Sequence, residues 1–162
     1  MTNKDIPEMT TREDEKNLKS DSRILLNNRF TLSIPPDWED RSYYRFEGPV
    51  EDGIKHSILV TIENSVKVPN LEQYAERNMK SMETELQGYQ ELKRGTLTLD
   101  SRVPAYELVY KWTPLKERQV YQRVIYILLN NTGYILTATF SKKTWKMLGP
   151  VINKILMSFK PA

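Results

Sequence analysis

Residues 118–140 read RQVYQRVIYILLNNTGYILTATF, and this stretch decides the fold. Two runs rich in Val, Ile, Tyr and Thr flank the sequence Asn-Asn-Thr-Gly at 130–133. β-Branched and aromatic residues favour strands, and Asn and Gly tolerate the positive φ angles of tight turns. The stretch therefore predicts a β-hairpin. With the loop centred on Asn131 and Thr132, we expect Leu129 to lie opposite Tyr134.

This register sorts the hairpin into two faces, because successive side chains of a strand point to opposite sides. One face is almost entirely apolar and is expected to form the core. The other is apolar with polar groups spaced along it, so we expect something to cover it. The first face carries Ile125, Ile127, Leu129, Tyr134, Leu136, Ala138 and Phe140, and the second carries Val120, Gln122, Val124, Tyr126, Leu128, Ile135, Thr137 and Thr139.

The charge balance gives no argument for a nucleic-acid partner. The 162 residues include 24 basic and 21 acidic side chains, a formal net charge of +3. Arginines alternate with aromatic residues at 41–46, where they could form a stacking platform for single-stranded nucleic acid. The same alternation is common on half-exposed strands, where the stem of Arg covers apolar surface. We therefore expect no nucleic-acid partner.

The N-terminus and the apolar runs indicate a cytoplasmic protein. No run approaches the roughly 18 apolar residues that span a bilayer, so direct membrane insertion is not expected. The first residues, Met1–Met9, lack the apolar segment of a secretory signal. The chain has no cysteine, which excludes disulfides and acylation of a lipoprotein cysteine.

The rest of the chain alternates predicted strands with two amphipathic helices. The first helix starts after Asn70, an N-cap residue type. The apolar stripe of the second extends from Trp145 to Phe159, and Pro150 within it could kink or restart the helix. This order predicts an α+β fold, an antiparallel sheet with two main helices packed on one face. We expect a disordered tail at 1–22 and a single domain at 23–162. Further strands are predicted at 23–26, 29–34, 40–46, 56–63, 92–99 and 104–112.

The patterns of catalytic and metal-binding sites are missing from the sequence. His56 is the only histidine, and no motif surrounds it. Metal sites need clustered Cys, His or carboxylate ligands, and the pair Glu51-Asp52 is better explained as solubilising a loop. The 6 glycines are dispersed, so no phosphate-binding loop is formed. We expect a protein that is not an enzyme and that holds no cofactor and no metal.

The apolar content of the sheet exceeds what helices on one face would cover. The central hairpin, with Tyr44 and Phe46 grouped beside it, puts apolar side chains on the second face as well. Antiparallel sheets normally leave that face polar. A large exposed apolar patch generally marks an interaction site. A dimer partner or the N-terminal hairpin could equally bury the patch.

Three stretches together resemble the DcrB-like domains and, within them, the Eag-type chaperones of the type VI secretion system. They are 38–46, 71–89, and 104–112 taken with the strand from Arg118 and with Thr137, Thr139 and Trp145. The resemblance covers roughly 29–160. It implies a PsbP-like α/β sandwich, usually a homodimer. It also implies a cytoplasmic chaperone that cradles the N-terminal transmembrane helices of a toxin effector before the effector is loaded onto the secretion spike.

The resemblance also implies site residues. The apolar pair that follows the Trp-x-Asp-Arg pattern falls on Tyr44 and Phe46, and the glutamine of the Arg-x-x-Gln strand falls on Gln122, with Gln119 second. The chain departs from the family pattern in its aromatic residues at the apolar pair and in its longer loop at 48–53. The implied client-binding groove comprises Tyr44, Phe46, Val120, Gln122, Val124, Tyr126, Leu128, Thr137 and Thr139.

Two other interpretations stay open at this point. One is a DcrB/PsbP-like accessory or structural subunit of a membrane-associated assembly, without enzymatic activity. The missing leader and missing lipoprotein cysteine argue against it. The other is an enzyme or a binder of a small ligand, which needs a concave pocket with converging polar groups.

Overall fold

The computed structural model describes residues 23–26, 31–115 and 118–162. The chain divides into two units, with the boundary between Asp40 and Arg41. In the first unit, β1 (Arg23–Leu26) pairs with antiparallel β2 (Thr31–Ile34), which confirms the predicted N-terminal hairpin. The predicted tail at 1–22 lies outside the described residues, so its disorder and the domain boundary after it stay predictions.

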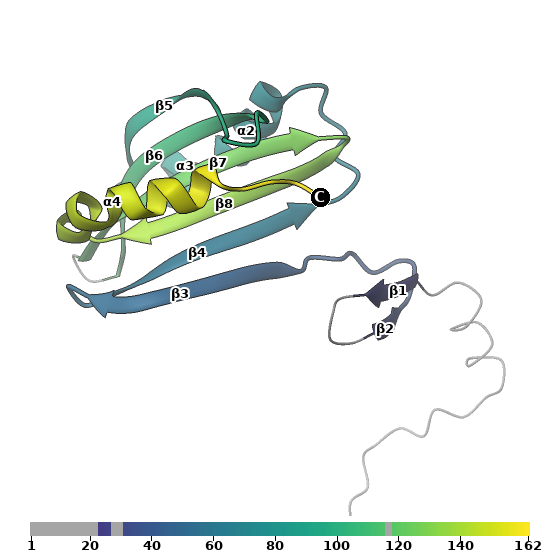
Figure 1. Ribbon diagram of the computed structural model, residues 1–162, viewed down its shortest axis with the longest axis horizontal. Helices are drawn as coiled ribbons and strands as arrows, with labels where there is room; N and C mark the ends of the chain where they lie inside the picture. The colour runs from purple at the N-terminus through teal and green to yellow at the C-terminus, as the bar shows by residue number, and fades with distance from the viewer. Residues whose placement is uncertain (1–22, 27–30, 116–117) are drawn as a thin grey trace, which may run out of the picture. The chain divides into compact units, whose positions relative to one another are not determined.

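The second unit is built on a six-stranded antiparallel sheet with the strand order β3-β4-β8-β7-β6-β5 (Figure 1). The central hairpin of the sequence therefore lies in the middle of the sheet, and β3 and β5 are its two edges. The elements are β3 (Tyr43–Glu51), β4 (Ile54–Glu63), α2 (Leu71–Met79), α3 (Met82–Glu85), β5 (Gln90–Thr98), β6 (Pro104–Leu115), β7 (Arg118–Leu129), β8 (Thr132–Phe140) and α4 (Lys142–Met157).

The turn between β7 and β8 is tighter than predicted. Asn130 and Asn131 both have positive φ angles, 50° and 61°, and form a two-residue turn in which Leu129 lies opposite Thr132. The predicted pairing of Leu129 with Tyr134 is therefore wrong. The pairing is displaced by two residues, an even number, so every side chain keeps its predicted face.

The two helices lie on opposite faces of the sheet, with α4 in front of β7 and β8 in Figure 1 and α2 behind. The α4 face buries Ile125, Leu136 and Phe140 against Leu156. The α2 face buries Val124 and other residues of the second predicted set against α2. The α+β class is confirmed, but the prediction that both helices pack on one face is wrong.

Chain connectivity explains why sequence periodicity missed this arrangement. An amphipathic stripe shows that a helix packs on something, but it does not say on which face. Helix α2 connects β4 to β5, which run in the same direction at opposite sides of the sheet, so the chain has to cross over one face. Helix α4 follows β8 directly and folds back over the other face.

Local sequence signals set the helix boundaries. Asn70 caps α2 by accepting a hydrogen bond from the backbone N–H of Gln73, at 2.9 Å. Ser141 and Thr144 form a reciprocal capping box at the start of α4. Pro150 lies inside α4, and the helix runs on through it. Gly149 helps to explain this continuity, since a Cβ on the residue before proline disfavours helical backbone.

Candidate functional site

The predicted client-binding residues do not form one surface. Val124 and Tyr126 lie on the α2 face with exposures of 2% and 1%, packed in one cluster with Tyr74 of α2. Their side chains are therefore covered by this chain itself. Leu128, Thr137 and Thr139 are half-buried on the same face, and Val120 is buried.

Tyr44 and Phe46 lie on the other face of the sheet. Tyr44 pairs with Val60 and Phe46 with Ile58, and both of these partners belong to the core beneath α4. Tyr44 and Phe46 are 52% and 61% exposed, because β3 is an edge strand. The expectation that they share a face with Gln122 is wrong. Strand alternation is unambiguous within one hairpin, but it does not link the faces of strands far apart in sequence.

Gln122 is the centre of a hydrogen-bond network on the α2 face. Its Oε1 accepts hydrogen bonds from the hydroxyl of Tyr110 and from the indole N–H of Trp112, each at 2.7 Å. Its Nε2 donates to Oγ1 of Thr139, at 3.1 Å. Burial raises the pKa of Tyr110 to about 12, so this hydroxyl stays a donor at neutral pH. The amide of Gln122 therefore connects β6, β7 and β8.

Helix α4 carries a second apolar stripe besides the one that packs on the core. Met147, Val151 and Ile155 are spaced by four residues and are 58%, 55% and 48% exposed. The flank of α4 that faces β5 and β6 carries positions such as Gly149 and Asn153. Each residue of the exposed stripe comes two residues after a position on that flank. A step of two residues rotates by about 200° around a helix, so the stripe is on the flank towards β4 and β3.

The stripe on α4 and the aromatic side chains of β3 lie on the same side of the sheet, the side that α4 covers in part. Tyr44 and Phe46 come from β3, Met147, Val151 and Ile155 come from α4, and β4 runs between these two elements. In Figure 1 none of the described helices lies in front of β3 and β4. We call this the α4–β3 apolar surface, defined by Tyr44, Phe46, Val60, Ile62, Met147, Val151 and Ile155.

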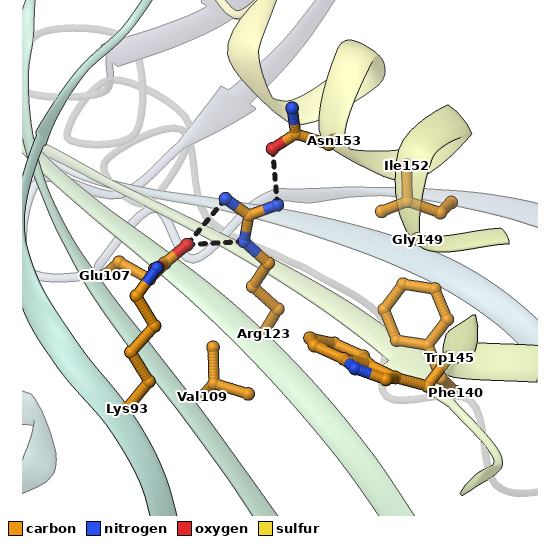
Figure 2. A pocket seen from close by; sticks show the side chains of 9 residues that line it. All are labelled: Lys93, Glu107, Val109, Arg123, Phe140, Trp145, Gly149, Ile152 and Asn153. Carbon is orange, nitrogen blue, oxygen red and sulfur yellow. Dashed lines mark hydrogen bonds and ion pairs between the residues drawn. The ribbon is translucent and has the colours of Figure 1, made fainter.

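A charged pocket of about 310 Å³ opens on the other flank of α4 (Figure 2). The buried carboxylate of Glu107 lies on its floor, 2.7 Å from Nζ of Lys93 and 2.6 Å from Nε of Arg123. Nη1 of Arg123 donates to Oδ1 of Asn153 on α4, at 2.7 Å. The network therefore ties α4 to β5, β6 and β7.

Burial alone would raise the pKa of Glu107, but the hydrogen bond from Lys93 and the charge and hydrogen bond of Arg123 outweigh it and hold the pKa below its usual value. The carboxylate is therefore ionised at neutral pH. Sequence reasoning missed this cluster. The available signal was a single charge inside each of two apolar strands, Glu107 in 105–110 and Arg123 in 120–129.

The described residues give little support for a metal site, a catalytic histidine or a membrane-spanning helix. No group of three His, Cys, Asp or Glu side chains gathers there as a metal site would require. His56 is buried on β4, with Nδ1 3.4 Å from the carbonyl oxygen of Thr139. None of the helices in this part of the chain has both the length and the apolar character needed to cross a membrane.

The fold and the site define an α+β protein with an exposed apolar surface beside its C-terminal helix. The chain belongs to the DcrB family, which it matches over residues 30–154. No relative was found among curated proteins.

Three solved structures are similar to the chain. A Pseudomonas aeruginosa protein of unknown function, PA94, aligns with a TM-score of 0.71 and 20% identity, covering 88% of this chain and 98% of that one. LpqN of Mycobacterium tuberculosis, involved in cell envelope biogenesis, gives a TM-score of 0.48 and 17% identity over 84% and 75%. The cyanobacterial PsbP of Synechocystis gives 0.49 and 10% over 88% and 93%. The first match establishes a shared fold.

Proposed function

We propose that this protein is a cytoplasmic chaperone or adaptor that binds the hydrophobic, transmembrane-type N-terminal helices of a secreted toxin effector and assists their loading onto a type VI secretion spike. The observation that carries the proposal is the α4–β3 apolar surface. Membership of the DcrB family and the sequence resemblance to Eag-type chaperones support it.

The chemistry of the surface suits an apolar helix. A transmembrane helix in water exposes apolar side chains around its whole circumference, and burying them gains about 25 cal/mol per Å². The surface offers aliphatic and thioether side chains from α4 and aromatic side chains from β3. A client helix lying between them would contact Val151 on one side and Phe46 on the other.

The position of the surface at an exposed edge supports a transient role. Strand β3 is an edge strand of the six-stranded sheet that the described residues form, and its aromatic side chains are more than half exposed. Apolar side chains in such a position are a liability for a protein that never binds a partner, because they promote aggregation. A chaperone needs them accessible, since its client has to enter and leave without the chaperone unfolding.

The test is co-purification of the protein with a co-expressed, tagged transmembrane segment. Phe46→Asp places a charge on the surface and is expected to abolish capture. Tyr43→Asp is the matched control, because Tyr43 belongs to the same strand, is 63% exposed and points to the opposite face. Both variants are expected to keep the circular dichroism spectrum of the wild type. Val151→Asp tests the α4 side in the same way.

Three results would contradict the proposal. Capture that survives both Phe46→Asp and Val151→Asp would remove the surface from client binding. Equal loss with Tyr43→Asp would indicate a general effect of added charge. Failure of the wild-type protein to protect any transmembrane segment from aggregation would refute the chaperone function itself.

The proposed chaperone is a homodimer, as the resemblance implies. A second copy could shelter the exposed apolar side chains while no client is bound. Sedimentation equilibrium of the client-free protein tests this proposal, and a strict monomer at high micromolar concentration would refute it.

A further inference from the structure

The charged pocket beside α4 has two chemically different ends. Lys93, Glu107, Arg123 and Asn153 gather at one end (Figure 2). The other end is walled by apolar side chains, and the ring of Trp145 stands edge-on to that of Phe140 with 5.2 Å between their centroids. The apolar lining is completed by Val109 and Ile152.

The polar end carries an excess positive charge. The two cations of Lys93 and Arg123 face the single carboxylate of Glu107, so the balance is one positive charge. Arg123 directs its donors to Glu107 and to the amide oxygen of Asn153. The side chain of Lys93 is 68% exposed, so its ammonium group can donate to a ligand as well as to Glu107.

The size of the pocket matches a small organic molecule. Ligand sites are commonly about 300–1,000 Å³ and combine an apolar lining with a few placed polar groups. Gly149 contributes to the space because it presents no side chain, and a Cβ built there meets no heavy atom within 4 Å. A network that served only to hold α4 on the sheet would gain nothing from leaving this volume open.

We propose that the pocket binds a small amphipathic carboxylate. The anion accepts hydrogen bonds from the ammonium of Lys93 and the amide of Asn153, and its aromatic or branched aliphatic body packs against Trp145 and Ile152. The excess positive charge of the pocket would repel a cationic ligand. Such a ligand would also find no free carboxylate oxygen, because both oxygens of Glu107 already have cationic partners. This site is independent of the α4–β3 apolar surface, which lies on the opposite flank of the helix.

The experiment compares three small molecules of similar shape that differ in charge. Their binding to the full-length protein is measured by calorimetry and by changes in ¹H–¹⁵N chemical shifts. The three molecules are 3-phenylpropionate, its neutral amide and 2-phenylethylamine. Saturable binding of the carboxylate is expected, with shifts at Gly149 and Asn153. Loss of a charge-assisted hydrogen bond in Lys93→Met should weaken binding about tenfold. Val109→Phe, which fills the pocket floor, should abolish it.

The proposal is overturned if the amide or the amine binds as tightly as the carboxylate, if no probe binds, or if Lys93→Met binds like the wild type. If Val109→Phe fails to fold, the test rests on Lys93→Met alone. The side chain of Lys93 is exposed, so its replacement leaves the fold intact. Capture of transmembrane segments by Lys93→Met is expected to be unchanged, so failure here is distinguishable from failure of the proposed function.

Discussion

Val124 and Ile125 are neighbours on β7, and both are buried beneath different helices, Val124 under α2 at 2% exposure and Ile125 under α4 at 0%. The central hairpin is therefore the middle layer of three, with neither face left open in this region. The open apolar area lies further out, towards β3. The exposed aromatic side chains of β3 are therefore better placed to meet a partner than Val124.

Val124→Asp and Ile125→Asp are both expected to unfold the protein or nearly so. Each places a carboxylate without a partner in an apolar core, and the resulting cost is large compared with typical stabilities of about 5–15 kcal/mol. Circular dichroism with urea titration measures the effect. Met147→Asp, at a 58% exposed position, is the control and should fold. A folded Val124→Asp with wild-type stability would show that α2 does not cover this face.

The sequence predicted the sheet well because the signals for it are local. The sorting of the hairpin into two faces was correct even though the pairing slipped by two residues, since face depends only on parity. The Asn70 cap was also correct, because capping needs only neighbouring residues. These predictions rest on contacts within a few residues or across one turn.

The placement of the candidate site depended on long-range geometry that the sequence does not encode locally. Tyr44 and Gln122 fall on opposite faces of the sheet. Strand β3 pairs with β4, and β4 pairs with β8 of the hairpin, so the registers of both pairings decide which side chains of β3 share a face with those of the hairpin. The cluster around Glu107 was missed for a related reason. A charge in an apolar strand has no evident partner until the neighbouring strands are in register.

Gln122→Ala is expected to lower the free energy of unfolding by about 1–3 kcal/mol. The substitution leaves the hydroxyl of Tyr110 and the indole N–H of Trp112 without their shared acceptor in a half-buried region. Urea denaturation measures the loss. Capture of a transmembrane segment should persist, because Gln122 lies on the α2 face. Lost capture with unchanged stability would instead place Gln122 at the client interface.

Gly133→Ala is expected to destabilise the protein by about 1–3 kcal/mol, the usual cost of overpacking a core. A Cβ at Gly133 would overlap the phenol ring of Tyr74, which is fully buried and cannot move aside. Gly48→Ala is the control, since a Cβ there reaches only ordinary contact with His56, at 3.5 Å. Thermal melts of both variants compare the two positions. Equal melting temperatures would show that α2 packs less closely on β8 than described.

Glu107 is expected to make stability dependent on acid pH. Its pKa in the folded protein lies below the ordinary value of 4.5, so the folded state holds the ionised form more strongly than the unfolded chain does. The resulting stabilisation is fully present above pH 4.5 and is lost as the pH falls through the lower pKa of the folded state. Urea denaturation between neutral pH and pH 3 measures the decline.

Glu107→Gln should flatten this acid dependence and lower stability at pH 7, because Arg123 then lies largely buried without a counter-charge. Removing one partner of a fully buried ion pair costs about 3–5 kcal/mol, and the access of water to Lys93 places this case near the lower end. Lys93→Met is the matched control and should cost under about 1 kcal/mol, since that side chain is 68% exposed. If Glu107→Gln keeps the wild-type acid dependence, the carboxylate of Glu107 is not the group whose ionisation stabilises the fold.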